Sequence, residues 1–153
     1  MYLAIVISLM FVLPAASAGI EHFHSSGAVS WMTLAGKWFV FWGAGVRLLT
    51  AGLRQSLQPR VTAVEIFRMK TDEALPVIRE LGIGNFAVGL AGVVSLWVPD
   101  FIVPVALIAA IFYGAAGIFH VAANTRSMNE NVAMVSDFWA AAILAAYLVH
   151  LKV

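Results

Sequence analysis

Five stretches of mostly apolar residues follow one another along the chain, separated by short polar segments. Each approaches the about 20 residues that an α-helix needs to cross the hydrocarbon core of a bilayer. We therefore expect an all-α, polytopic transmembrane helix bundle of four to five spans, forming one domain over residues 1–153. The expected spans cover about residues 2–20, 31–53, 73–97, 101–123 and 132–150.

The first stretch decides between four spans and five. It ends in Ala16-Ser17-Ala18, a sequence typical of a signal-peptidase site. A secretory signal normally begins with basic residues, however, and the first Lys or Arg of this chain is Lys37. We therefore favour a retained span over a cleaved signal.

The basic residues predict the orientation of the bundle. Segment 61–70 mixes apolar residues with charged ones, which is typical of a short helix lying in the headgroup region. Lys and Arg gather in the loops 54–72 and 124–131, whereas the opposite connections hold none. The positive-inside rule then places these two loops in the cytoplasm, and we expect the chain to lie in the cell (inner) membrane.

The composition agrees with a membrane location. Hydrophobic residues make up 62% of the chain and charged residues 11%, whereas soluble domains carry roughly 25% charged residues. The lipid bilayer is therefore the expected partner, and the net charge of +1 gives no reason to expect nucleic acid. The absence of cysteine excludes disulfides, thiolate metal sites and iron–sulfur clusters, and no other cofactor is indicated.

Ionisable side chains of four expected spans come at a similar depth. The depth of each group follows from its distance along the helix from the span end beside the basic loops, at about 1.5 Å per residue. Each group then lies roughly 5–10 Å inside the cytoplasmic boundary of the hydrocarbon core. These four residues are Arg47, Glu80, His120 and Asp137. The sequence therefore predicts a polar layer near the cytoplasmic face. Further candidate members lie beside them or in the adjoining loop, namely Arg79, Asn85, Tyr113, Asn124, Asn129 and Asn131.

Small residues accompany these polar groups at helical spacing. Such residues mark the faces where membrane helices approach closely, so the polar groups should point into the bundle. A carboxylate there needs a cation, and Arg47, Arg79 and His120 are the available ones. The small residues are Gly89 and Gly92 after Asn85, Gly117 between Tyr113 and His120, and Ala141 and Ala145 after Asp137.

Two interpretations of the layer stay open. It either fixes the register of the helices by pairing, or it binds a ligand, handles protons or ligates a metal. A metal has the weakest support, because no Glu-x-x-His pair is present. A separate outer group of His22, His24 and His150 could bind copper or zinc, although histidines at such places are more often simply solvated.

Several of these residues also form an ordered pattern. It runs Glu80-x-Gly82-x-x-Asn85, then Gly117-x-x-His120, Asn129-x-Asn131 and Asp137. In this order it resembles a family of small bacterial and archaeal integral membrane proteins of unknown function, over about residues 65–150. That family often has Gly directly before its His, whereas two residues intervene here. The helix layout is more loosely similar to DoxX-like four-helix membrane proteins, some of them linked to quinone-coupled redox chemistry.

We expect a membrane module that binds a small ligand, a lipid, a partner subunit or a second copy of itself. The alternative is a membrane enzyme or redox subunit acting on a lipophilic substrate such as a quinone. Glu80, His120 and Asp137 would then donate and accept protons. A transporter ranks last, because the middle of the bundle offers few polar groups for a route across the membrane.

Overall fold

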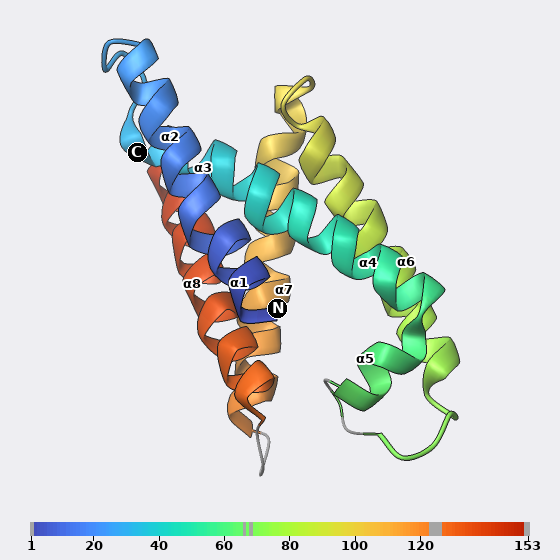
Figure 1. The fold of residues 1–153 in the computed structure, drawn as a ribbon. Coiled ribbons are helices and arrows are strands. Elements are labelled where there is room, and N and C mark those ends of the chain that lie inside the picture. The colour runs from blue at the N-terminus through green and yellow to red at the C-terminus, as the bar shows by residue number, and fades with distance from the viewer. Residues whose placement is uncertain (1, 66, 68, 123–126, 152–153) are drawn as a thin grey trace.

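The computed structural model describes residues 2–65, 67, 69–122 and 127–151, and every regular element within them is a helix. Four helices are long and apolar enough to cross a membrane, which confirms the predicted all-α membrane fold. They are Tyr2–His24, Leu75–Val94, Pro99–Ala122 and Met128–His150. Figure 1 shows them packed with a further long helix over residues 31–57.

The first two long helices are each built from three consecutive segments. The first comprises α1 (Tyr2–Ile7), η1 (Ser8–Val12) and α2 (Leu13–His24). The second comprises α3 (Trp31–Trp38), η2 (Phe39–Val46) and α4 (Arg47–Leu57). This second helix matches an expected span but is not one of the four most apolar, because Lys37, Arg47 and Arg54 lower its hydropathy.

Both middle segments, η1 and η2, are π-helical, so their wider turns leave backbone carbonyls for other partners. The Tyr113 hydroxyl donates to the carbonyl of Gly43, and the Trp139 indole donates to that of Met10 at 3.2 Å. Side chains of α7 and α8 thereby satisfy polar backbone groups that lipid cannot. These bonds tie the first two helices to the last two.

The remaining elements complete the bundle at slightly different boundaries from those expected. The third span begins at Leu75 after an Ala74 cap, and Asp72 instead pairs with Arg60 at 3.6 Å. The last helix begins at Met128, because Ser127 and Glu130 form a capping box. The elements are α5 (Pro59–Glu65), α6 (Leu75–Val94), η3 (Pro99–Phe101), α7 (Ile102–Ala122) and α8 (Met128–His150).

Glycines bring α4 and η2 into close contact with α6. A Cβ on Gly45 would lie 2.8 Å from the carbonyl carbon of Gly92, and one on Gly52 would lie 2.6 Å from the carbonyl oxygen of Gly82. A Cβ on Gly89 would collide with the backbone of Leu49. The predicted small-residue face of α6 is therefore a helix–helix interface.

The second close pair is α7 with α8, and the first helix lies against α8 (Figure 1). On α7 the predicted face is buried at Tyr113 and Gly117. On α8 the prediction holds for Asp137 but is wrong for Ala145, which is exposed. The buried face of α8 instead includes Ala140, Leu144 and Tyr147. An α-helix has about 3.6 residues per turn, so residues spaced strictly four apart drift around the helix axis and leave the buried face.

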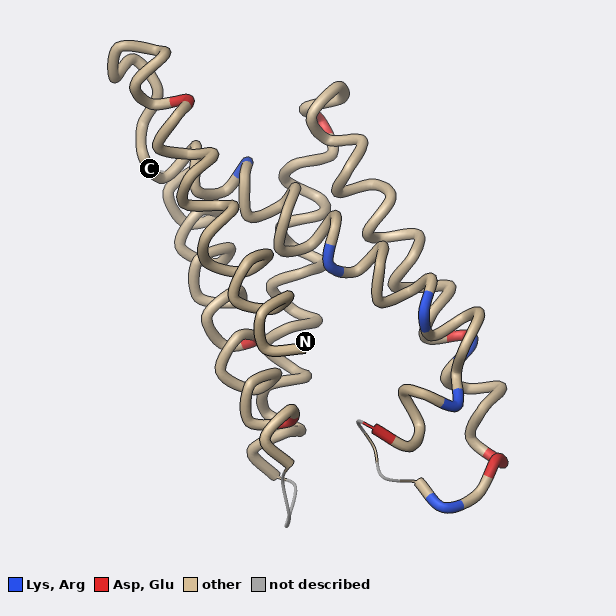
Figure 2. Tube along the Cα trace, in the orientation of Figure 1, with Lys and Arg blue, Asp and Glu red and all other residues tan. Residues whose placement is uncertain are grey.

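Charged residues are unevenly distributed along the bundle. Figure 2 shows most Lys and Arg positions near α5 and the adjoining ends of α4 and α6. At the opposite end Lys37 pairs with Glu21 at 2.7 Å. The long apolar stretches between these ends are the parts that a bilayer would surround.

Candidate functional site

An ion pair between the second and last long helices forms the centre of the candidate site. Nη1 of Arg47 donates to Oδ1 of Asp137 at 3.1 Å, and the two side chains are only 15% and 6% exposed. The guanidinium also donates to Oγ of Ser136 and to Sδ of Met10, each at 3.4 Å. Arg47 therefore points into the bundle rather than outward to the interface, because the buried carboxylate provides its partner.

Two α7 side chains approach this pair. Nε2 of His120 lies 4.0 Å from Oδ2 of Asp137, and the Arg47 guanidinium lies 5.2 Å from the centre of the Tyr113 ring. A cation over an aromatic face is attracted by the ring's negative face. Arg47, Tyr113, His120 and Asp137 thus come together from α4, α7 and α8.

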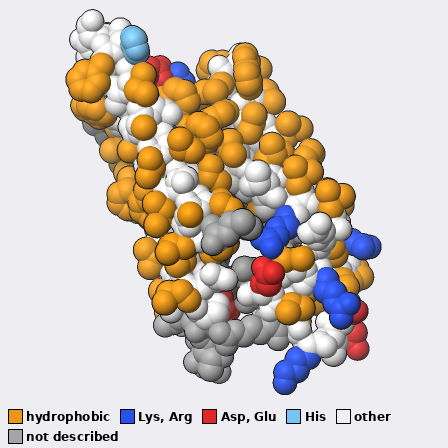
Figure 3. All heavy atoms as spheres, in the orientation of Figure 1, with side chains coloured by type: hydrophobic (Ala, Val, Ile, Leu, Met, Phe, Trp, Pro, Cys, Tyr) orange, Lys and Arg blue, Asp and Glu red, His pale blue; other side chains and the backbone are white. Residues whose placement is uncertain are grey.

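These four residues line a cavity rather than a closed core. The cavity has a volume of about 330 Å³, within the range of small-molecule sites. Its walls come from the first long helix and from α4, α5, α6, α7 and α8. Figure 3 shows a hollow in the molecular surface with charged side chains beside it. The polar groups of the site are therefore accessible to a molecule of modest size.

Asn85 of α6 lines the cavity and is hydrogen-bonded to Gln55, a residue that the sequence pattern did not predict. Its Nδ2 donates to Oε1 of Gln55 at 2.8 Å, and both residues line the cavity. Gln55 follows Arg47 and Ala51 at four-residue intervals, which places all three on one face of α4. That spacing was the available signal for Gln55.

Glu80 and Arg79 lie elsewhere. Both are exposed, and neither lines the cavity within the described part of the chain. The buried face of α6 instead passes through Ile78, Gly82 and Asn85. Counting residues along a helix predicts depth but not direction around its axis, and Glu80 points away from the face that packs.

Two of the predicted asparagines after α7, Asn129 and Asn131, do not line the cavity either. Asn129 is half-buried and Asn131 exposed, and both belong to the first turn of α8 rather than to a loop. Asn124 lies outside the described residues. The capping box at Ser127 extends α8 further than its apolar pattern predicted.

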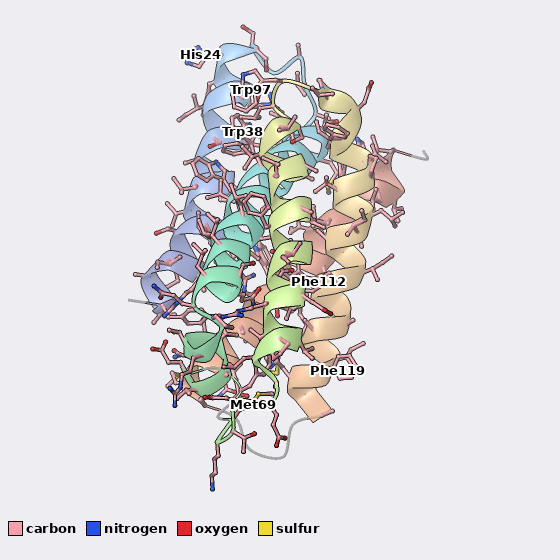
Figure 4. All side chains as sticks on the ribbon, turned by 90° about the vertical axis from the view of Figure 1, so that its right-hand side faces the viewer. His24, Trp38, Met69, Trp97, Phe112 and Phe119 are labelled. Atoms are coloured by element: carbon pink, nitrogen blue, oxygen red, sulfur yellow. The ribbon has the colours of Figure 1, made fainter. Side chains whose placement is uncertain are left out.

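The outer histidines connect the ends of helices. The ring of His22 stacks on Trp31 with 4.0 Å between centres, and its Nδ1 lies 3.2 Å from the carbonyl oxygen of Val29. Nε2 of His150 lies 3.3 Å from Oγ of Ser30, whereas His24 is exposed at the end of α2 (Figure 4). Among the described residues no three His, Cys, Asp or Glu side chains are placed to hold a metal ion.

Comparison with protein-family models identifies the family of this chain. The model of DUF6790, a family of unknown function, matches residues 3–152. The chain belongs to the DUF6790 family. The expected membership of a family of unknown function is thereby confirmed, while the similarity to DoxX-like proteins stays a prediction. No curated protein and no solved structure matches this DUF6790 protein.

The cavity lining of the DUF6790 protein determines which ligand groups it can contact. The described lining combines guanidinium, carboxylate, imidazole and phenol groups with apolar side chains. Such a site can donate hydrogen bonds to a polar ligand group while its walls contact hydrocarbon.

Proposed function

We propose that this protein is a membrane module that binds a small amphipathic ligand in the cavity lined by the first long helix, α4, α5, α6, α7 and α8. The observation that carries the proposal is that the Arg47–Asp137 pair lines a cavity of about 330 Å³. A pair that only joined two helices would need no such space around it, since protein interiors otherwise pack densely. Groups held in place beside a cavity are instead typical of ligand sites.

The walls support an amphipathic ligand rather than a fully polar one. Apolar side chains of the first helix, among them Val6 and Leu9, line the cavity together with Leu48 and Phe112. The same lining also includes polar groups, among them the Arg47–Asp137 pair. A ligand with one polar end and one apolar end would satisfy both parts of the lining.

We further infer that the cavity opens toward the cytoplasmic side of the cell membrane. The support is the distribution of positive charge, since most Lys and Arg positions lie near α5 and the adjoining ends of α4 and α6 (Figure 2). Arg54, Arg60, Lys70 and Arg79 belong to this part of the chain. The positive-inside rule associates this end with the cytoplasm.

A membrane enzyme or redox subunit acting on a lipophilic substrate such as a quinone is the second candidate. It is favoured by His120, whose Nε2 lies 4.0 Å from Oδ2 of Asp137 in the cavity wall. Imidazole and carboxylate together can donate and accept a proton. Glu80 would take no part, because its side chain is exposed outside the cavity.

A pair of neighbouring alanines allows a matched test of ligand binding. Ala116 lines the cavity, whereas Ala115 is exposed on another face of α7. We expect Ala116→Leu to remove a copurifying small molecule that wild type and Ala115→Leu retain in native nanodiscs. Mass spectrometry would identify this molecule, and visible absorption would reveal a chromophore. Equal occupancy in both variants, or an empty wild-type protein, would contradict the proposal.

A further inference from the structure

A second, apolar cavity adjoins the polar one. Its volume is about 260 Å³, and it shares Leu48, Leu81, Asn85 and Phe112 with the lining of the polar cavity. Because these four side chains line both cavities, the two spaces lie next to each other. The residues that line only the apolar space are Gly84, Val88 and Ile108. We call this apolar space the α6–α7 slot.

The α6–α7 slot is a gap between two helix pairs. Helix α6 packs mainly on α4, and α7 packs mainly on α8, so α6 and α7 contact each other little. Figure 4 shows Phe112 at the level where these two helices run side by side. Ile108 is 48% exposed and Leu81 is 37% exposed, so the slot reaches the apolar outer surface. In a bilayer, that surface faces lipid chains.

The slot has room for a hydrocarbon chain partly because position 84 has no side chain. A Cβ built on Gly84 would meet no atom within 4 Å. The glycines that bring α4 and α6 together differ in this respect, since a Cβ on Gly52 or Gly89 would collide with backbone atoms. Gly84 therefore leaves open space, whereas the others allow close helix contact.

The lining of the polar cavity carries more positive than negative charge. Two guanidinium groups, those of Arg47 and Arg54, and one carboxylate, that of Asp137, line it among the described residues. Arg54 also pairs with Glu65 at 3.2 Å, but these side chains are 48% and 57% exposed. Such a surface pair contributes little stability, so an anion can replace Glu65 as a partner of Arg54.

We propose that the polar cavity and the α6–α7 slot together hold a single-chain anionic amphiphile, which enters sideways from the bilayer. Its carboxylate or phosphate head binds beside Arg47 and Arg54, and its hydrocarbon chain lies in the slot past Gly84 and Phe112. This inference rests on the proposed ligand-binding function of the polar cavity. It adds the class of ligand and the route by which the ligand arrives.

Photolabelling with a palmitate analogue that carries a diazirine in mid-chain tests this proposal in phosphatidylcholine nanodiscs. We expect labelling of wild type at residues 81–88 and 108–112. Gly84→Leu should lower that labelling several-fold and Gly84→Ala should lower it less. Gly19→Leu is the matched control, because a Cβ at Gly19 also meets no atom within 4 Å, and Gly19 does not line the slot. Size-exclusion profiles would verify that each variant is folded.

Competition identifies the head group. Unlabelled palmitate or hexadecyl phosphate should suppress labelling. Stronger suppression by palmitate would indicate a carboxylate head group, and stronger suppression by hexadecyl phosphate would indicate a phosphate head group. Hexadecanol and hexadecyltrimethylammonium should not. Labelling spread evenly over the lipid-facing helices in all variants, or equal competition by the cation, would overturn the inference. If Ala116→Leu still removes a copurifying molecule in that case, the proposed binding function survives without this ligand class.

Discussion

Arg47 and Asp137 lie 90 positions apart in the chain, and their side chains meet at 3.1 Å between Nη1 and Oδ1. The pair joins α4 to α8 and also lines the cavity, so it serves both the packing of the helices and the candidate site. An ionised group at this depth is costly without a partner, which explains why the two side chains are directed at each other.

The first prediction concerns the stability of this pair. Replacing one partner leaves the other charge buried and unpaired, so we expect Asp137→Leu to lower the free energy of unfolding by about 3 kcal/mol. The double variant Arg47→Met with Asp137→Leu should recover much of this loss, since no unpaired charge remains. Unfolding of the single and double variants in mixed detergent micelles would measure the coupling. Additive losses in the double variant would show that the two residues do not depend on each other.

The second prediction concerns the contact of α6 with α4. A methyl group at Gly89 would collide with the Leu49 backbone, so Gly89→Ala should destabilise the bundle by about 1–3 kcal/mol. The same change at Gly84 meets no neighbouring atom and improves helix propensity, so it should leave stability unchanged or raise it by up to about 1 kcal/mol. Thermal unfolding in detergent would compare them. A loss at Gly84 as large as that at Gly89 would be inconsistent with the packing described.

The third prediction concerns the start of α8. Oγ of Ser127 accepts from the backbone N–H of Glu130 at 3.1 Å, and the Glu130 carboxylate accepts from the Ser127 N–H at 2.6 Å. Ser127→Ala should cost about 1 kcal/mol and speed amide exchange in the first turn of α8. Hydrogen–deuterium exchange would detect the change. Met128→Ala, at an exposed neighbouring position, should leave the exchange of this turn unaltered.

The fourth prediction separates the residues that share a depth from those that share a site. Glu80→Gln should leave occupancy of the cavity unchanged, because Glu80 is exposed and outside the lining. Asp137→Asn, an equally conservative change, should alter occupancy because it weakens the hold on Arg47. Native mass spectrometry of the two variants provides the comparison. If Glu80→Gln empties the cavity, α6 must turn a different face toward it.

Part of the candidate site could be predicted from the sequence. Their positions along the spans predicted one layer containing Arg47, His120 and Asp137. In the structure, the Arg47 and His120 side chains both approach the Asp137 carboxylate. The depth of Glu80 was as suitable, yet its side chain lies on the outer face of α6. Gln55 was not predicted, because an uncharged polar residue near the end of a span is common and does not by itself indicate a site. In the structure its hydrogen bond to Asn85 joins α4 to α6.

The sequence by itself determined that this is a helical membrane protein, because long apolar runs with few charges leave hardly any other way to satisfy the backbone in lipid. It also indicated that Gly89 and Gly92 allow close helix contact on α6, since their spacing places them on one helix face with Asn85. Only the tertiary structure decided which polar groups share a cavity. That outcome depends on the rotation of each helix about its axis and on the gap between the α4–α6 and α7–α8 pairs. Both are set by side-chain packing between distant parts of the chain, which no local pattern records.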